Sequence, residues 1–177
     1  APRLSYIVNS LLMPRKRRTV DPMNVVSTSV LDDASGTILL TTMTDNPSCI
    51  NDTSGASGQA FKTYRSMNAI KMLDNSVFAG ESPAQIGLPN YYAVTLADMK
   101  NAFAACKASS ANGQYHIAYI ADANRYAGGT NYVYADTHAK FQRPEATVNP
   151  KRWQWGKNAY TAGGGAILDP VTGQPVE

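Results

Sequence analysis

The chain has 177 residues, enough for one domain with a sizeable hydrophobic core. Hydrophobic residues make up 44% and charged residues only 16%, and a net charge of +3 is too small to indicate a nucleic-acid partner. No apolar run approaches the roughly 18 residues of a membrane span. Low charge together with many Ser, Thr, Asn, Gly and Tyr residues favours an exported protein. The basic run at residues 15–18 indicates either a phosphate or membrane patch or a solvated loop between prolines, and we favour the loop.

The first quarter of the chain predicts two strands. LSYIVNSLL, residues 4–12, favours a strand or an extended edge, and TILLTTMTD, residues 37–45, is β-branched and apolar and predicts a buried strand. Residues 13–24 are polar and predict a loop. VVSTSVLDDASG, residues 25–36, is ambiguous and indicates at most a short turn of helix.

Two central segments have the apolar spacing of helices. In residues 61–73 apolar side chains recur about every three positions, which predicts a helix. The segment 95–108 starts with Thr95 as N-cap and has Asp98 three residues later, close to a capping box. One face of this second helix is expected to pack in the core, and its members are Leu96, Met99, Phe103 and Cys106.

The second half predicts more strands and ends in an arm. QYHIAYIA, residues 114–121, alternates in the manner of a strand. NYVYA and HAKFQ flank Asp136 and Thr137, which is hairpin spacing. Residues 144–177 contain two Trp, a Gly run and several Pro, and predict an irregular arm with a short strand at 166–168.

The sum of these elements is an α+β domain with an antiparallel β-sheet and one or two helices. Residues 1–143 are expected to form the globular head, and the arm 144–177 to pack on the same domain.

Patterns for catalysis are weak. His116 and His138, with Asp122 and Asp136, would supply a two-His, two-carboxylate metal site, but no metal-binding spacing joins them. A GxSxG motif is absent from the sequence, and Cys106 is expected on a core face. We therefore expect no enzyme activity and no cofactor. Calcium is the more plausible ion, with Asp169 or the pair Asp32–Asp33 as candidates, although ordinary turn-forming roles explain these residues better.

The two cysteines, Cys49 and Cys106, allow one internal disulfide. Cys49 lies in a polar loop, which favours a bridge to Cys106 formed in an oxidising compartment; two unrelated thiols are the alternative. Asn51 opens the tripeptide Asn-Asp-Thr, a candidate site for N-glycosylation.

The segment ANRYAGGTNYVYADTHAKFQ resembles the C-terminal signature of bacterial prepilin-type proteins, named for a His, nine residues and then Asp-Gly. Tyr126 stands in place of the signature's His, and Thr137 in place of its Gly. The upstream segments LSYIVN and ASGTILLTTMTD also resemble parts of the family, so the likeness covers residues 4–45 and 122–142. The matching positions are Arg125, Gly128, Gly129, Asn131, Tyr132, Ala135, Asp136, His138 and Lys140.

The resemblance implies a type IV pilin or pseudopilin fold, in which a globular head with an antiparallel sheet packs against copies of itself. Such heads build extracellular, cell-surface filaments or a periplasmic pseudopilus, and the resemblance implies no catalytic residue. A two-residue type I′ turn requires positive φ angles that Gly adopts and Thr resists. Thr137 therefore predicts a different turn, or a longer loop with a bulge.

Pilins normally begin with an apolar helical segment, which this sequence does not show. Three explanations stay open: a truncated head, a mature chain cut from its helix, or a two-chain pilin whose short helical subunit is separate. We favour the processed or two-chain explanation, in which a short N-terminal helix chain is a second partner.

Tyr91, Tyr92, Trp153 and Trp155 are candidates for contacts between subunits, since Tyr and Trp are favoured anchors at interfaces. Covering their own core is the alternative. The leading hypothesis is a structural subunit that self-assembles into a filament for motility, adhesion, secretion or conduction. A second is a secreted surface adhesin or carbohydrate-binding module that uses the Tyr/Trp-rich tail. A third is an enzyme centred on Asp136 and His138.

Overall fold

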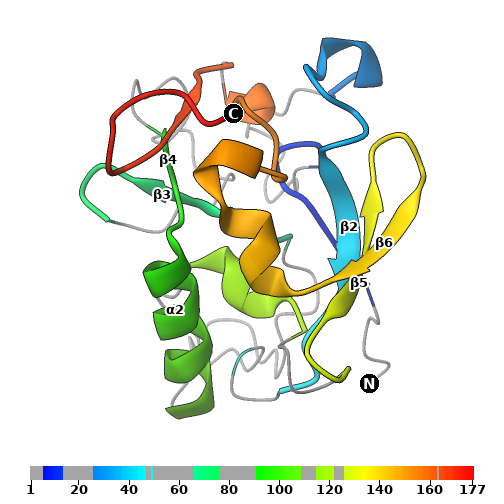
Figure 1. Cartoon of the computed structure of the whole chain (residues 1–177), viewed down its shortest axis with the longest axis vertical. Helices are drawn as coiled ribbons and strands as arrows, with labels where there is room; N and C mark the ends of the chain where they lie inside the picture. The colour runs from blue at the N-terminus through cyan, green and yellow to red at the C-terminus, as the bar shows by residue number, and fades with distance from the viewer. Residues whose placement is uncertain are drawn as a thin grey trace, which may run out of the picture.

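The computed structural model describes residues 6–13, 26–46, 49, 66–75, 91–108, 115–121, 126–162 and 164–177. Within these ranges the protein contains one longer α-helix, several short 3-10 helices and two β-sheets (Figure 1). The chain is therefore a mixed α and β protein in which sheets predominate, which agrees with the expected α+β class. No helix in the described ranges has both the length and the apolar character needed to cross a membrane.

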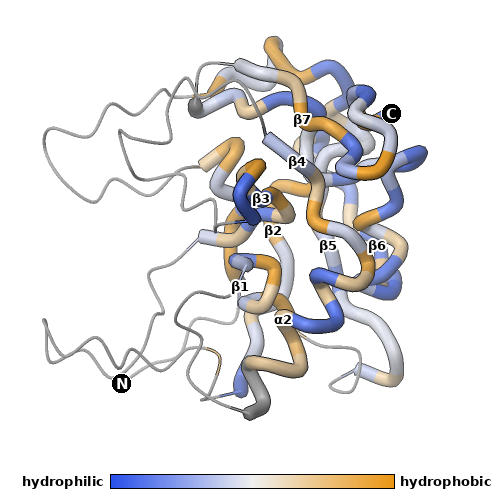
Figure 2. The backbone as a smooth tube through the Cα atoms, turned by 90° about the vertical axis from the view of Figure 1, so that its left-hand side faces the viewer, coloured by the Kyte–Doolittle hydropathy of each residue, from blue (hydrophilic) through white to orange (hydrophobic). Residues whose placement is uncertain are grey.

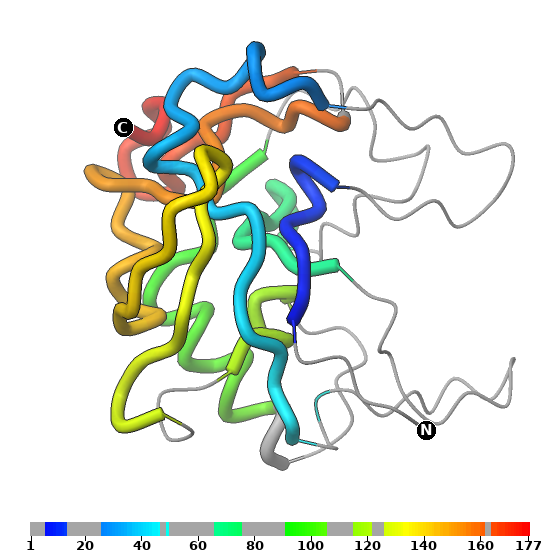
Figure 3. Tube along the Cα trace, turned by 90° about the vertical axis from the view of Figure 1, so that its right-hand side faces the viewer, coloured from blue at the N-terminus to red at the C-terminus, as the bar shows by residue number. Residues whose placement is uncertain are grey.

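The larger sheet has four antiparallel strands in the order β1-β2-β5-β6. Figure 3 shows β2 running between β1 and the hairpin formed by β5 and β6. The strand predicted at 37–45 is confirmed as β2, between β1 and β5. The strand predicted at 4–12 is confirmed only over the edge strand β1, since residues 10–12 form a turn. The strand bounds are Tyr6–Val8 for β1, Ile38–Thr42 for β2, Thr130–Tyr134 for β5 and Ala139–Gln142 for β6.

The smaller sheet joins the middle of the chain to its C-terminal part. Strand β4 (Tyr91–Ala93) pairs antiparallel with β3 (Ile70–Met72) and parallel with β7 (Ile167–Leu168). The two hydrophobic residues of β7, orange in Figure 2, lie beside β4. The short strand expected at 166–168 is thereby confirmed.

The helix predicted at 61–73 is wrong where the structure describes it. Residues 70–72 form β3, and all three of their side chains are buried, so the segment does not have the single apolar face of a surface helix. Asn68 also opposes a helix, because its Oδ1 accepts the backbone N–H of Ile70 at 3.1 Å. Nζ of the buried Lys71 donates to Asp98 Oδ2 at 2.7 Å, which gives the ammonium group a carboxylate partner.

Helix α2 (Leu96–Ala108) begins with the capping box that the sequence predicts. The Asp98 N–H donates to Thr95 Oγ1 at 3.1 Å, and the Thr95 N–H donates to Asp98 Oδ2 at 3.0 Å. The predicted core face needs correction, since Leu96 is 42% exposed, whereas Met99 and Ala102 are buried.

The strand predicted at 114–121 is also wrong. His116–Tyr119 form a short 3-10 helix in which all four residues are buried. Only Ile120 makes a β-bridge, to Met43. All four side chains of this helix are buried, so their alternation in the sequence does not mark an inner and an outer face. The pattern therefore could not distinguish a strand from a buried turn.

The C-terminal segment shares one hydrophobic core with the preceding elements. Three short 3-10 helices cover Pro144–Val148, Pro150–Arg152 and Tyr160–Ala162. Trp155 is fully buried, and its ring lies edge-on against that of Tyr132, with centroids 6.4 Å apart. Residues of this segment therefore pack in the common core, and the segment is more regular than its composition indicated.

A buried asparagine joins three segments that are distant in the chain. Asn9 Nδ2 donates to the carbonyl of Ile38 at 2.8 Å and to that of Trp155 at 3.1 Å. Asn9 Oδ1 accepts the N–H of Leu11 at 3.0 Å. Since a buried polar group without partners is costly, this side chain fixes β1, β2 and the tail relative to one another.

Candidate functional site

The hairpin tip connects β5 and β6 through a three-residue loop, Ala135–Thr137. The Tyr134 N–H donates to the His138 carbonyl, and the Thr137 N–H donates to the Tyr134 carbonyl, both at 2.9 Å. Thr137 has φ 78°. A left-handed residue at the end of a three-residue loop is the usual arrangement of a bulged hairpin. The longer loop with a bulge, predicted from Thr137, is therefore confirmed.

Asp136 and His138 lie within bonding distance of each other. Asp136 Oδ1 lies 2.6 Å from His138 Nδ1 and accepts the His138 backbone N–H at 3.2 Å. The hydrogen bond with the His138 side chain holds the pKa of Asp136 below its ordinary value. Both side chains are exposed, and the imidazole stacks on the ring of Tyr134 with centroids 4.3 Å apart. Asp136 thus closes the loop and orients the imidazole.

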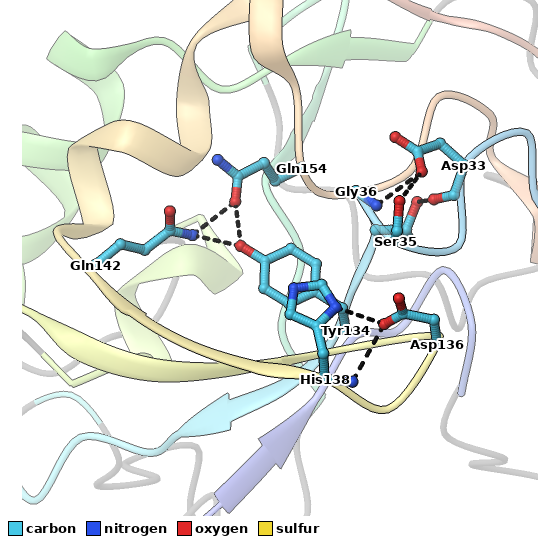
Figure 4. Close-up of polar contacts among 9 residues, drawn as sticks. Asp33, Ser35, Gly36, Tyr134, Asp136, His138, Gln142 and Gln154 are labelled. Carbon is cyan, nitrogen blue, oxygen red and sulfur yellow. Dashed lines mark hydrogen bonds and ion pairs between the residues drawn. The ribbon is translucent and has the colours of Figure 1, made fainter.

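A polar triangle ties the hairpin to the tail (Figure 4). The Tyr134 hydroxyl donates to Gln154 Oε1 at 2.6 Å. Gln142 Nε2 donates to the Tyr134 hydroxyl at 2.7 Å and to Gln154 Oε1 at 2.6 Å. Burial raises the pKa of Tyr134, so the phenol stays protonated at neutral pH and serves as a structural hydrogen-bonding group.

Beside this triangle lies a depression of about 350 Å³, which we call the basic depression. Three elements distant in the chain meet there: the loop before β2, the hairpin, and the tail. Its basic side chains are Lys140, Arg152 and Lys157, with His138 on the hairpin side. Its acidic side chains are Asp33 and Glu177, and its other lining residues are Ser35, Gly36, Tyr134, Trp153 and Gln154.

The carboxylate of Asp33 is already engaged by its own turn. Asp33 Oδ1 accepts from Ser35 Oγ and from the Gly36 N–H, each at 2.8 Å. The Ser35 hydrogen bond, more than any other contact, lowers the pKa of Asp33, and the positive charge of Lys157 acts in the same direction. Ser35 therefore directs its proton to Asp33, and not toward the imidazole of His138.

The candidate calcium ligands accept hydrogen bonds from the protein. Asp32 Oδ2 accepts from Asn158 Nδ2 at 2.7 Å and from the Tyr160 hydroxyl at 3.1 Å. Asp169 accepts the Val171 N–H and the Thr172 hydroxyl within its own turn. In the part of the chain that the structure describes, no group of three or more His, Cys, Asp or Glu could hold a metal ion.

The two histidines have different surroundings. His116 is buried in its 3-10 helix, where its ring lies 5.3 Å from that of Tyr119, and it is not among the residues lining the basic depression. Asp122, the fourth member of the metal set considered from the sequence, lies outside the described residues. The metal set is thus not assembled in the described structure.

The aromatic residues considered for subunit contacts lie mainly inside the protein. Tyr91 and Trp155 are fully buried and Trp153 is 4% exposed, so their place in the core accounts for them. A subunit contact through these three side chains would require the core to open. Tyr92 is half-buried and has surface to offer. An interface role stays a prediction.

The disulfide and the glycosylation site also stay predictions. Cys49 is buried, but the side chain of Cys106 and all of Asn51 lie outside the described residues. Sequence reasoning missed the residues that build the depression, chiefly Lys140, Arg152 and Gln154 as a group. No motif joins them, because they are brought together only by the packing of the tail against the hairpin.

Comparison of the chain with protein-family models, curated proteins and solved structures found no significant match.

Proposed function

We propose that this chain is the globular head of a pilin-like subunit and that its role in an extracellular filament is structural. The main support comes from the signature-like segment 126–142. Its residues Gly128, Gly129 and Asp136 meet requirements of the backbone, and we find no group of side chains in the described part of the chain that is arranged as a catalytic centre.

The two glycines of the signature show this most directly. Gly128 has φ 101°, a backbone conformation that residues with a Cβ atom rarely adopt. A Cβ on Gly129 would lie 2.8 Å from the carbonyl oxygen of Gln142 and 2.8 Å from the ring of Phe141. Gly128 therefore permits the entry into β5, and Gly129 permits its close approach to β6. Asp136 has a comparable role, since it closes the tip of the hairpin.

The rival functions have less support. An enzyme centred on Asp136 and His138 would need a reacting group beside the imidazole, and the nearby Ser35 donates to Asp33. An adhesin that binds sugars through the Trp residues of the tail would need those rings at the surface, where Trp153 and Trp155 do not lie.

Exposed aromatic side chains on the two outer strands of the larger sheet are candidates for contacts between subunits. Tyr6 on β1 is 61% exposed, and Phe141 on β6 is 56% exposed. These two strands are the edges of the four-stranded sheet. Exposed aromatic side chains are favoured anchors at protein interfaces, so they are the first residues to change in an assembly test.

The test is immunogold electron microscopy of the source cells with antibodies to this chain. Labelled surface filaments are expected, and the variants Tyr6→Ser and Phe141→Ser should reduce them while the protein stays folded. Val171→Ser is the matched control, since Val171 is 85% exposed and lies in a turn of the tail. Label confined to the cell interior would argue against the filament role. Filaments unaffected by both aromatic changes would argue against contacts through Tyr6 and Phe141.

A further inference from the structure

The basic depression has features of a ligand site that the filament role does not require. We propose that it binds an anionic group, a carboxylate, sulfate or phosphate, carried by a ligand about the size of a monosaccharide. Its volume of about 350 Å³ falls within the range of small-molecule sites, which is roughly 300–1,000 Å³.

The positive charges available for a ligand come from two different elements. Lys140 lies on β6, and Arg152 ends the 3-10 helix Pro150–Arg152. Neither side chain forms a hydrogen bond or ion pair with another residue in the described part of the chain. Arg152 can present two parallel N–H groups to a carboxylate, sulfate or phosphate, the geometry in which guanidinium binds such groups best.

The negative charges of the depression only partly offset these cations. Asp33 is held by Ser35 and Gly36, and the positive charge of Lys157 also lowers its pKa. Lys140 and Arg152 are then left with Glu177 as the remaining carboxylate of the lining. Among the lining side chains, three cations (Lys140, Arg152 and Lys157) face two carboxylates, so one positive charge is in excess.

The walls of the depression are fixed before any ligand arrives. The triangle of Tyr134, Gln142 and Gln154 holds the hairpin against the tail. Asn149 caps the turn that presents Arg152, accepting the N–H of Lys151 at 3.0 Å. Cationic groups on an ordered frame lose less entropy on binding than the same groups on a loose loop.

The experiment is an NMR titration of the ¹⁵N-labelled full chain at low salt with three probes of similar size. Glucuronate carries a carboxylate, glucose 6-phosphate carries a phosphate, and glucose carries no charge. Saturable shifts are expected for the two acids at the amides of Lys140, Arg152 and Gln154, and none for glucose. The acid that binds with the lower Kd identifies the anionic group that the site prefers.

The variants Arg152→Gln and Lys140→Gln should each weaken binding of the acid about tenfold, the loss expected for one charged hydrogen bond. Lys151→Gln is the matched control, because it removes the same charge from an exposed neighbouring residue that does not line the depression. Thermal unfolding of each variant shows that the fold is intact. The titration uses the unassembled chain, so its result is independent of filament formation.

Three outcomes would overturn the proposal. The first is glucose binding as tightly as the acids. The second is an equal loss of affinity in Lys151→Gln and Arg152→Gln, which would indicate diffuse surface charge. The third is binding of polygalacturonate without binding of either acidic monosaccharide, which would indicate general attraction of a polyanion and no defined site.

Discussion

Replacing Thr137 by Gly should stabilise the protein, although it removes a side chain. Thr137 is held at φ 78°, in the left-handed region that a β-branched residue adopts only with strain. The strain costs about 1–2 kcal/mol, and Gly relieves it. Gly also makes the unfolded chain more flexible, which offsets about 0.4–1 kcal/mol of the gain. The exposed Thr137 side chain forms no hydrogen bond within the described part of the chain, so little else is lost.

The expected result is an increase of about 0.5–1 kcal/mol in the free energy of unfolding, or roughly 1–4 °C in Tm. Urea unfolding followed by circular dichroism measures the first quantity, and a thermal scan the second. Thr137→Asn should fall between the two, because Asn tolerates this conformation better than Thr does.

Ala139→Gly provides the matched control on the same hairpin. Ala139 is exposed and lies in the extended strand β6, where Gly should cost about 0.5–1 kcal/mol. The reasoning is refuted if Thr137→Gly lowers stability as Ala139→Gly does, because the backbone at position 137 would then not be strained.

Three further changes test the packing and the charges. Gly129→Ala should lower the free energy of unfolding by about 1–3 kcal/mol in urea, because its Cβ would meet a backbone carbonyl of β6 at 2.8 Å; an unchanged midpoint would show that the strands can separate at little cost. Asn9→Ala should cost about 3 kcal/mol by the same measurement, since it leaves buried backbone groups of three segments without partners, and a loss below about 0.5 kcal/mol would contradict that role. Asp98→Asn should weaken the acid sensitivity of folding. Burial opposes ionisation of Asp98, but hydrogen bonds from Lys71 and Thr95 outweigh it, so the pKa lies below its ordinary value. The stabilisation is present above pH about 4, the unfolded-state value, and is lost as pH falls through the lower folded-state pKa. Tm measured from pH 5 to 2 should therefore fall less steeply in the variant.

The elements that the sequence predicted correctly are those fixed by neighbouring residues. The capping box needs only Thr95 and Asp98, and the hairpin needs two β-rich segments and a short polar loop. Thr137, which stands where the prepilin signature has Gly, is itself informative, because a Thr at this position disfavours the common two-residue type I′ turn. Local rules of this kind do not depend on what packs against the segment.

The incorrect predictions concern segments that are buried on all sides. In β3 and in the 3-10 helix His116–Tyr119 every side chain is buried, so neither a helical nor an alternating period separates an inner from an outer face. Tertiary packing then decides the backbone conformation. The same holds for Trp155, whose place in the core depends on how the tail returns to β5.

The basic depression could not be predicted for a related reason. Arg152 is an exposed residue of a short 3-10 helix, Lys157 is a half-buried residue of the tail, and Lys140 is one of several exposed residues of β6. Their charges meet where the tail packs on the hairpin, to which Gln154 bonds. A site assembled from single residues on three segments leaves no spacing motif in the sequence.

The residues that give the sequence its resemblance to prepilin-type proteins meet requirements of the backbone. Gly128 and Gly129 admit a conformation and a close contact, and Asp136 closes a loop. Thr137 departs from the signature at a strained position, and the hydrogen bonds of Tyr134 and Asp136 hold the loop in its bulged form. We therefore expect the exchange between Thr and Gly at position 137 to change the free energy of unfolding more than the conformation of the loop. What the protein contacts is decided by exposed side chains such as Tyr6, Phe141 and Arg152, and those are the residues on which function should be tested.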